Sequence, residues 1–347
     1  MQRTVALAAI LALLGACAPG RPASAPEAES ADTGTRALLL PVPVPPGYAE
    51  ALRRGTRDTT GAPGPRYWQQ RVRYTIEAEL DPATATLRGR ERIVYHNRSP
   101  APLGEVVLNL YQNVFAEGAP RNRQAPVTGG IRLERVAAQG QPLTGYALQG
   151  TIARLPLPRP LAPGDSAALE VEWSFRVPPA GAWRTAWEDA LGGRVFQVAQ
   201  WYPQVAVLDD VRGWDATPYL GDGEFYLEYG DFDVSLTLPP GWLVGATGEL
   251  RNAGEVLPPG VLARLSAAAG TDGVTRVVTG DDLAAGRATL PGRGGKLTWR
   301  FAAREVRDFA FAASDRYAWD AVPATVPGEG AAPARAVLVH ALYRPGS

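Results

Sequence analysis

The stretch YTIEAELDPATATLRGRERIVYHNRS, residues 74–99, sets the pattern that the rest of the chain repeats. From Val72 to Leu80 every second residue is apolar, and Arg, Thr or Glu residues stand between them. A period of two places the apolar side chains on one face of a β-strand. The residues DPATATLRG then turn the chain, and 90–96 supplies the partner strand. The stretch therefore predicts a β-hairpin with one buried face.

The same alternation returns at intervals along the sequence. We expect further strands at 106–110, 169–177, 232–238 and 297–301. Proline pairs follow two of these segments, which is where a strand has to end. Many short strands separated by Gly and Pro predict an all-β fold, a saddle-like antiparallel β-sandwich. Helical patterns are rare, with short helices expected at 47–54 and 261–269.

The N-terminus resembles the leader of a bacterial lipoprotein. Met1–Arg3 carries positive charge, Thr4–Leu14 is apolar, and the residues Leu-Gly-Ala-Cys end at Cys17, the single cysteine. The apolar run is too short to span a bilayer. Residues 1–17 therefore predict a signal peptide, and the resemblance implies lipidation of Cys17. We expect secretion across the inner membrane of a bacterium and a lipid anchor in a membrane, at the periplasmic face or the cell surface. The alternative is a buried N-terminal helix with an incidental thiol.

Composition divides the remaining chain into three parts. Residues 18–66 are rich in Pro and Ala and predict a disordered tether. The alternating strands occupy 67–320, which we interpret as one N-terminal β domain. Residues 321–347 read as a linker followed by one strand that cannot bury itself alone. We therefore expect this last part to be the truncated start of a further domain.

The charge balance gives no sign of a nucleic-acid partner. The formal net charge is zero, and Lys296 is the only lysine among the 35 basic residues. The arginines are scattered along the chain instead of forming a basic run. We expect no nucleic acid among the partners.

Complete catalytic and metal-binding motifs are missing from the sequence. His96 and His340 are the only histidines, and neither has an acidic residue or a cysteine at a metal-ligand spacing. The motifs H-E-x-x-H and G-x-S-x-G do not occur, nor do the Walker and dinucleotide fingerprints. Eight acidic residues lie between Asp209 and Asp233 among aromatic residues. A glycosidase pair or a calcium loop would use such residues, but solvated turns and strand edges explain them more simply.

Three stretches together resemble the N-terminal domain of the family M1 metallopeptidases, the aminopeptidase N-like zinc enzymes or gluzincins. Residues 74–99 are similar to the opening hairpin of that domain. The segment 196–250, FQVAQWYPQ to LVGATGEL, is similar to its central part, and 297–314 to the strand pair that closes it. The order and spacing of the three stretches extend the resemblance over roughly Tyr67–Trp319.

The resemblance implies a β domain that precedes a zinc-dependent catalytic domain. In the family the second domain holds zinc through H-E-x-x-H and a later glutamate, and this chain contains no such motif. We therefore expect the chain to be inactive alone, without catalytic residues or metal ligands, and zinc to be bound only by the full-length aminopeptidase. The expected partners are the missing C-terminal catalytic domain, a peptide substrate and a membrane through the lipid anchor. The alternative function is a non-catalytic lipoprotein β domain that binds peptides, proteins or glycans.

The resemblance also implies a substrate-binding residue in the central segment. In the family a glutamine or glutamate contacts the substrate twelve positions before an aspartate, and Gln197 stands twelve positions before Asp209. The position of Pro203 departs from the family pattern, which makes Gln200 the alternate candidate. The simplest interpretation of Gln197 is an outward-facing strand residue.

Overall fold

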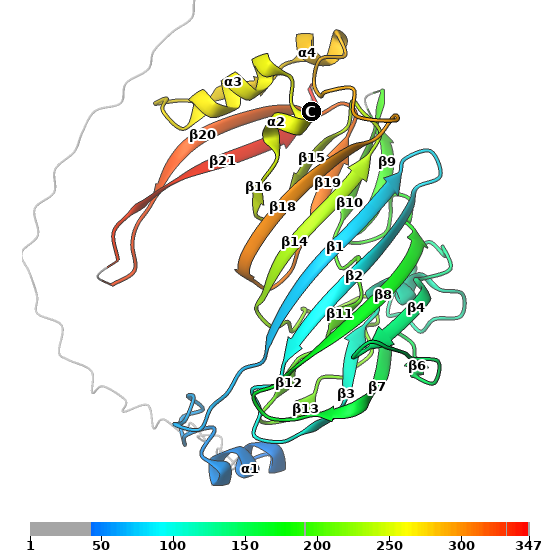
Figure 1. Cartoon of the computed structure of the whole chain (residues 1–347), viewed down its shortest axis with the longest axis vertical. Helices are drawn as coiled ribbons and strands as arrows, with labels where there is room; N and C mark the ends of the chain where they lie inside the picture. Colours follow the sequence, from blue (N-terminus) through cyan, green and yellow to red (C-terminus); the bar gives the residue numbers. More distant parts are fainter. Residues whose placement is uncertain (1–42, 191, 331, 346–347) are drawn as a thin grey trace, which may run out of the picture. The chain divides into compact units, whose positions relative to one another are not determined.

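The computed structural model describes residues 43–190, 192–330 and 332–345. The predicted signal peptide, its Cys17 and the tether as far as residue 42 lie outside the described residues. Residues Pro45–Ser347 belong to one compact unit. Strands dominate this unit and its helices are short, so the all-β prediction is confirmed (Figure 1).

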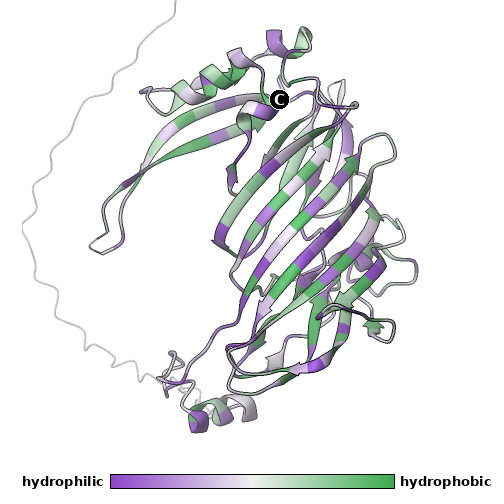
Figure 2. Ribbon diagram, in the orientation of Figure 1, coloured by the Kyte–Doolittle hydropathy of each residue, from purple (hydrophilic) through white to green (hydrophobic). Residues whose placement is uncertain are grey.

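Within the described residues the largest sheet has eight strands, and the opening hairpin lies at its centre (Figure 1). Its order is β16 (Glu249–Leu250), β18 (Leu297–Val306), β14 (Gly230–Leu238), β1 (Arg71–Asp81), β2 (Thr86–His96), β8 (Ser166–Arg176), β4 (Arg132–Ala138) and β5 (Gln141–Pro142). Burial alternates along β1 and β14, and Figure 2 shows hydrophobic and hydrophilic residues alternating along these strands. One face of the sheet therefore belongs to the core and the other faces solvent.

One of the described strand pairs in this sheet departs from the antiparallel prediction. β1 and β14 run parallel, with Tyr74 opposite Phe232 and Ile76 opposite Val234. A parallel pair needs a long crossover connection in place of a tight turn. The connection here is the whole segment 82–229 between β1 and β14, and it includes β2. The sheet is therefore mixed, and the distance between the two strands in the sequence concealed their pairing.

Smaller sheets account for the other described strands. One has the order β15 (Leu243–Ala246), β19 (Phe311–Ser314), β10 (Gly193–Val198) and β9 (Ala186–Ala190). Another has the order β11 (Gln204–Val205), β3 (Leu103–Asn109), β7 (Ile152–Leu161) and β6 (Ala147–Gln149). The remaining strands form the pair β12 (Leu208–Asp209) and β13 (Gly213–Trp214), and the sheet of β17 (Thr275–Val278), β20 (Ala318–Val326) and β21 (Arg335–Tyr343).

The described helices are α1 (Pro46–Arg54), the 3₁₀ helix η1 (Tyr111–Phe115), α2 (Ala253–Val256), α3 (Pro259–Ala268) and α4 (Gly280–Ala284). α1 and α3 confirm the helices predicted for 47–54 and 261–269. Over the part of the chain that the structure describes, no helix has the length and apolar character needed to cross a membrane.

The described part of the predicted tether, residues 43–66, has defined structure. α1 ends at Gly55, whose φ of 74° suits the left-handed conformation of a helix C-terminus. The side chain of Arg57 then binds the carboxylate of Asp210 through hydrogen bonds of 3.0 Å from Nε and 2.8 Å from Nη2. The segment therefore packs with the β domain ahead of the expected boundary at Tyr67.

The segment predicted as a linker after residue 320 also differs from the expectation. Its first residues belong to β20, which pairs with β21 from Ala318 opposite Tyr343 to Val326 opposite Arg335. Pro323 fits inside β20 because β17 pairs with that strand only as far as Ala321, and a proline is tolerated where one side of a strand is open.

Aromatic rings join the eight-stranded sheet to the sheet that contains β19. The ring of Trp173 on β8 contacts Trp201 with centroids 5.6 Å apart, and Trp201 contacts Phe311 on β19 at 5.3 Å. Tyr74 on β1 meets Tyr202 at 5.3 Å. Trp201 and Tyr202 are both fully buried. The aromatic pair of the segment FQVAQWYPQ is therefore core, and its glutamines remain the candidates for function.

Candidate functional site

Gln200 lies just after β10, at a point where the backbone adopts an unusual conformation. Its φ of 49° is in the left-handed region, which non-glycine residues seldom occupy. The side-chain amide of Gln112 donates to the carbonyl of Gln200 at 2.9 Å. Nε2 of Gln200 donates to Oδ2 of Asp308 at 3.0 Å. Contacts on both sides therefore fix the position of this side chain.

Asp308 is the group that organises this region. Its Oδ1 accepts the hydroxyl of Tyr202 at 3.0 Å and the backbone N–H of Phe309 at 2.8 Å. Burial raises the pKa of the carboxyl above its ordinary value of 3.8, against the opposing effect of these hydrogen bonds and that of Gln200. The sequence analysis missed Asp308, although it stands in the third M1-like stretch directly before Phe309, which is fully buried.

The hydrogen bonds continue from Tyr202 into the interior. Nε2 of Gln204 donates to the hydroxyl of Tyr202 at 3.0 Å, and the hydroxyl of Tyr74 accepts the N–H of Val205 at 3.0 Å. Two buried side-chain oxygens of the network, Oε1 of Gln112 and of Gln204, have no partner among the described residues. These hydrogen bonds form a polar network that orients Gln200, and the two unpartnered amide oxygens leave it with more acceptors than donors.

Gln197, the first candidate from the sequence, lies on β10 with an exposed side chain. Its Cα lies opposite Ala312 of β19 and Ala186 of β9. No hydrogen bond joins its side chain to any other described residue. The two candidate glutamines are thus three residues apart but differ in setting, since Gln200 is held by Asp308 and Gln197 is free on a strand surface.

The described residues do not fit a zinc centre. Over 43–190, 192–330 and 332–345 no group of three or more His, Cys, Asp or Glu side chains is arranged to hold a metal ion. His340 accepts a hydrogen bond from the indole of Trp319 at its Nδ1, 3.1 Å away. His96 lies at the end of β2, where burial and then Arg98, Arg71 and Arg73 lower its pKa.

The acidic residues of 209–233 are spread over turns and strand edges. Asp209 accepts the N–H groups of Val211 and Arg212 at 2.8 and 2.6 Å, which is a turn-capping role. Asp233 forms an ion pair with Arg304 on β18 at 2.7 Å. Neither arrangement presents two carboxylates to one bond, so the simpler interpretation of this acidic segment is the one the geometry favours.

Glu228 is the exception within this acidic segment. Burial raises its pKa to about 7, and the negative charge of Asp209 adds to the effect. Glu228 is half-buried, and it has no partner in the hydrogen-bond network of Asp308.

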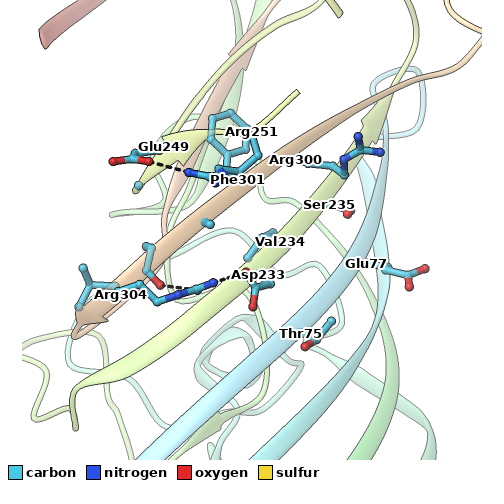
Figure 3. Close-up of a pocket in the computed structure, with 14 residues that line it drawn as sticks. Thr75, Glu77, Asp233, Val234, Ser235, Glu249, Arg251, Arg300, Phe301 and Arg304 are labelled. Carbon is cyan, nitrogen blue, oxygen red and sulfur yellow. Dashed lines mark hydrogen bonds and ion pairs between the residues drawn. The ribbon is translucent and has the colours of Figure 1, made fainter. Parts of the chain in front are cut away.

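A cavity of about 720 Å³ lies on the solvent-facing side of the eight-stranded sheet (Figure 3); we refer to it as the sheet cavity. Arg251 points to Glu249 at 2.8 Å and Arg304 to Asp233 at 2.7 Å (Figure 3). The other charged residues that line it are paired in the same way, Arg300 with Glu255 at 2.5 Å and Glu77 with Arg90 at 2.6 Å. Because the charged side chains that line the sheet cavity are already paired with one another or with neighbours, few charged groups remain for a ligand to bind.

A larger cavity, of about 1020 Å³, lies between α1 with its following loop and the loops around residues 97–101, 163–164 and 208–213. Four arginines line it, and we refer to it as the arginine cavity; they are Arg54, Arg66, Arg98 and Arg212. The sequence analysis missed this site because its residues come from separate segments and form no local motif.

No family model matches the chain, and no curated protein matches it. Among solved structures, the chain is similar to the M1 zinc metallopeptidase from Deinococcus radiodurans, with 16% identity and a TM-score of 0.42 over 80% of this chain and 48% of that one. A mutant of the same enzyme gives 17% identity and a TM-score of 0.42, over 82% of this chain and 50% of that chain. This chain therefore spans about half the length of the M1 zinc metallopeptidase structures that it matches.

Proposed function

We propose that this chain is the N-terminal β domain of a lipid-anchored zinc aminopeptidase of the M1 type. In the full-length enzyme it forms one wall of the substrate groove and docks against a catalytic domain that supplies the zinc. The chain itself carries no catalytic residue in this proposal. Its contribution is to hold the peptide and to shape the groove.

The observation that carries the proposal is the way the three M1-like stretches come together. They are far apart in the sequence, yet their strands are neighbours: β1 of the first pairs with β14 of the second, which pairs with β18 of the third. β10 and β15 of the second stretch both pair with β19 of the third. The resemblance therefore follows one paired set of strands, as expected when it reflects a common domain.

The setting of Gln200 supports its role in the groove wall. Its Nε2 is occupied by Asp308, which leaves the amide oxygen as the free acceptor. An amide oxygen accepts hydrogen bonds from a protonated amine, and a peptide presents such a group at its N-terminus. A fixed acceptor binds a ligand at a lower entropic cost than a mobile one. We assign the substrate contact to Gln200, with Gln197 as the alternate.

The lipid anchor is the part of the proposal that rests on sequence. The positive start, the short apolar run and the residues before Cys17 support export and lipidation. A single acyl chain binds a membrane weakly, so stable anchoring needs more than one chain. Replacing Cys17 by Ser should move the expressed protein from the membrane fraction to the soluble fraction, and an unchanged distribution would contradict the anchor.

The reading frame beyond Ser347 tests the domain assignment. We expect an H-E-x-x-H motif within roughly the next 150 residues, since zinc enzymes of this type bind the metal through that motif. A frame that closes without the motif would favour the alternative, a lipoprotein β domain that binds peptides, proteins or glycans without catalysis.

The two glutamines are compared in the full-length gene product. Gln200→Ala should raise KM for an aminoacyl p-nitroanilide about tenfold with a smaller change in kcat, because one hydrogen bond to a charged amine is lost. Gln197→Ala, three residues earlier on β10, serves as the matched control and should leave KM unchanged. The opposite ranking would transfer the contact to Gln197, and two unchanged KM values would remove both residues from the groove.

A further inference from the structure

The arginine cavity has a rigid wall. Asp210, only 3% exposed, accepts the two hydrogen bonds from Arg57, and its backbone carbonyl accepts Nη2 of Arg54 at 2.7 Å. The guanidinium of Arg57 also lies over the ring of Tyr67, 4.6 Å from its centroid. Breaking this pair is costly because it would leave the buried carboxylate of Asp210 without its partner. The loop after α1 is therefore fixed against the 208–213 loop, and the cavity between them has a defined form.

Positive charge in the arginine cavity exceeds the negative charge that could balance it. Within the described ranges, the side chains of Arg66, Arg98 and Arg212 form no ion pair and no hydrogen bond. The carboxylates of the cavity are engaged elsewhere, Asp210 by Arg57 and Asp209 by backbone N–H groups and the hydroxyl of Tyr226 at 3.2 Å. The lowered pKa of His96, caused first by burial and then by Arg98, is consistent with this positive field.

The rest of the cavity lining is mainly apolar. It includes two half-buried aromatic residues and several aliphatic and proline residues, namely Tyr67, Trp68, Pro100, Leu103, Pro163 and Leu208. A volume of about 1020 Å³ is at the upper end of the range of small-molecule sites. The lining therefore suits a ligand with an anionic head and an apolar body.

We propose that the arginine cavity binds a phosphate ester whose phosphate group meets Arg66, Arg98 and Arg212 and whose apolar part rests on Trp68 and its neighbours. Guanidinium groups bind phosphate in a two-pronged geometry. A phosphate monoester carries a charge of about −1.5 to −2 at pH 7, so it balances several arginines better than a single carboxylate does. The proposal is independent of the peptidase assignment, because its residues lie outside the network of Gln200 and Asp308.

The test is calorimetric titration of the full chain with hexyl phosphate, inorganic phosphate and hexanoate. We expect hexyl phosphate to bind more tightly than inorganic phosphate, and hexanoate to bind most weakly. Arg98→Gln with Arg212→Gln should weaken hexyl phosphate binding about tenfold or more, because charge-assisted hydrogen bonds to the phosphate are lost. Trp68→Ala should weaken hexyl phosphate and leave inorganic phosphate unchanged.

The matched control is Arg251→Gln with Arg300→Gln in the sheet cavity, which should leave the affinity unchanged. Exposed Arg66→Gln provides a second variant should the double variant fail to fold. Absence of binding, equal affinity for hexanoate, or equal loss in the control pair would overturn the proposal.

Vesicles distinguish the two sources of such a ligand. If the phosphate belongs to a lipid headgroup, the Arg98→Gln, Arg212→Gln variant should co-sediment with phosphatidylglycerol vesicles less than the wild type does. The two proteins should co-sediment equally with phosphatidylcholine vesicles. The N-terminal apolar run is the same in the wild type and the variant, so its contribution to vesicle binding cancels when the two proteins are compared. Equal sedimentation of the two proteins, together with a calorimetric loss, assigns the site to a soluble phosphate ester.

Discussion

Arginines line both the sheet cavity and the arginine cavity, but most of those in the arginine cavity lack the acidic partners found in the sheet cavity; Arg54, which pairs with Glu50, is the exception. In the sheet cavity Arg251, Arg300 and Arg304 each have an acidic partner. In the arginine cavity Arg66, Arg98 and Arg212 have none among the described residues. A cavity with paired charges is explained by the fold alone, whereas unpaired charges of one sign around a shaped space indicate a ligand.

The difference arises from how each surface is built. Neighbouring strands bring side chains of the same face into fixed register, and Glu77 of β1 lies directly opposite Arg90 of β2. Opposite charges at such positions stabilise a sheet. The loops around the arginine cavity have no such register, so nothing in strand pairing supplies partners for their arginines.

The largest expected effect concerns the wall of the arginine cavity. Arg57→Ala should lower the free energy of unfolding by about 3 kcal/mol, because it leaves the buried carboxylate of Asp210 without its partner. Arg251→Ala, which removes an exposed pair from the sheet cavity, should cost about 0.5 kcal/mol or less. Urea unfolding of the two variants measures both values, and similar losses would show that the wall is not held by this pair.

The pH dependence of the Arg57 effect follows from the pKa of Asp210. Burial raises that pKa, but hydrogen bonds from Arg57 and Thr56 outweigh burial and hold it below its ordinary value of 3.8. A lowered folded-state pKa gives stability that is present above pH 3.8 and is lost as the pH falls through the folded value. The gap between wild type and Arg57→Ala should therefore close on acidification; a gap that persists in acid would assign the loss to packing.

Charge reversal of one arginine in each cavity is expected to change the free energy of unfolding by different, smaller amounts. Arg304→Glu should lower stability by about 1 kcal/mol, since it removes an ion pair and places two carboxylates side by side with Asp233. Arg212→Glu should leave stability unchanged or raise it slightly, because it relieves repulsion among arginines. Thermal unfolding at low salt compares the two variants. Equal destabilisation by both would remove the distinction between paired and unpaired arginines.

The last expected effect is the one that depends most on pH, and it concerns Glu228. Its pKa is raised to about 7 by burial, with Asp209 of the arginine cavity as the second cause. A raised folded-state pKa stabilises the protein below pH 4.5, and this contribution is lost as the pH rises to about 7. Glu228→Gln should therefore gain stability relative to wild type between pH 5 and pH 8. Parallel stability curves for the two proteins would contradict the assigned pKa.

Much of the fold could be predicted because the period of two is local. The alternation of 72–80 matches the burial of β1, and the same parity places Glu91 on the buried face with Ile93 and Tyr95. The structure buries Glu91 to 3% exposure without a partner for its carboxyl among the described residues, and burial raises its pKa. The sequence analysis missed this inward acid, and the neighbours that leave it unpaired belong to other strands.

The features that escaped prediction depend on contacts between distant segments. β14 pairs parallel to β1 although a long connection separates them in the sequence. Arg57 binds Asp210, which lies more than a hundred residues later. The position of Gln200 was suggested by resemblance, while its left-handed backbone and its bond to Asp308 required the structure. Local patterns therefore predicted strands, and long-range pairing decided the sites.

The measurement that tests the central claim most directly is peptide hydrolysis by the full-length gene product. With zinc, it should release p-nitroaniline from an aminoacyl p-nitroanilide, lose this activity on chelation and regain it when zinc is restored. The 347-residue chain alone should show none. A zinc-loaded full-length product without peptidase activity, or hydrolysis by the isolated chain, would contradict the assignment of this domain to the groove wall of a zinc aminopeptidase.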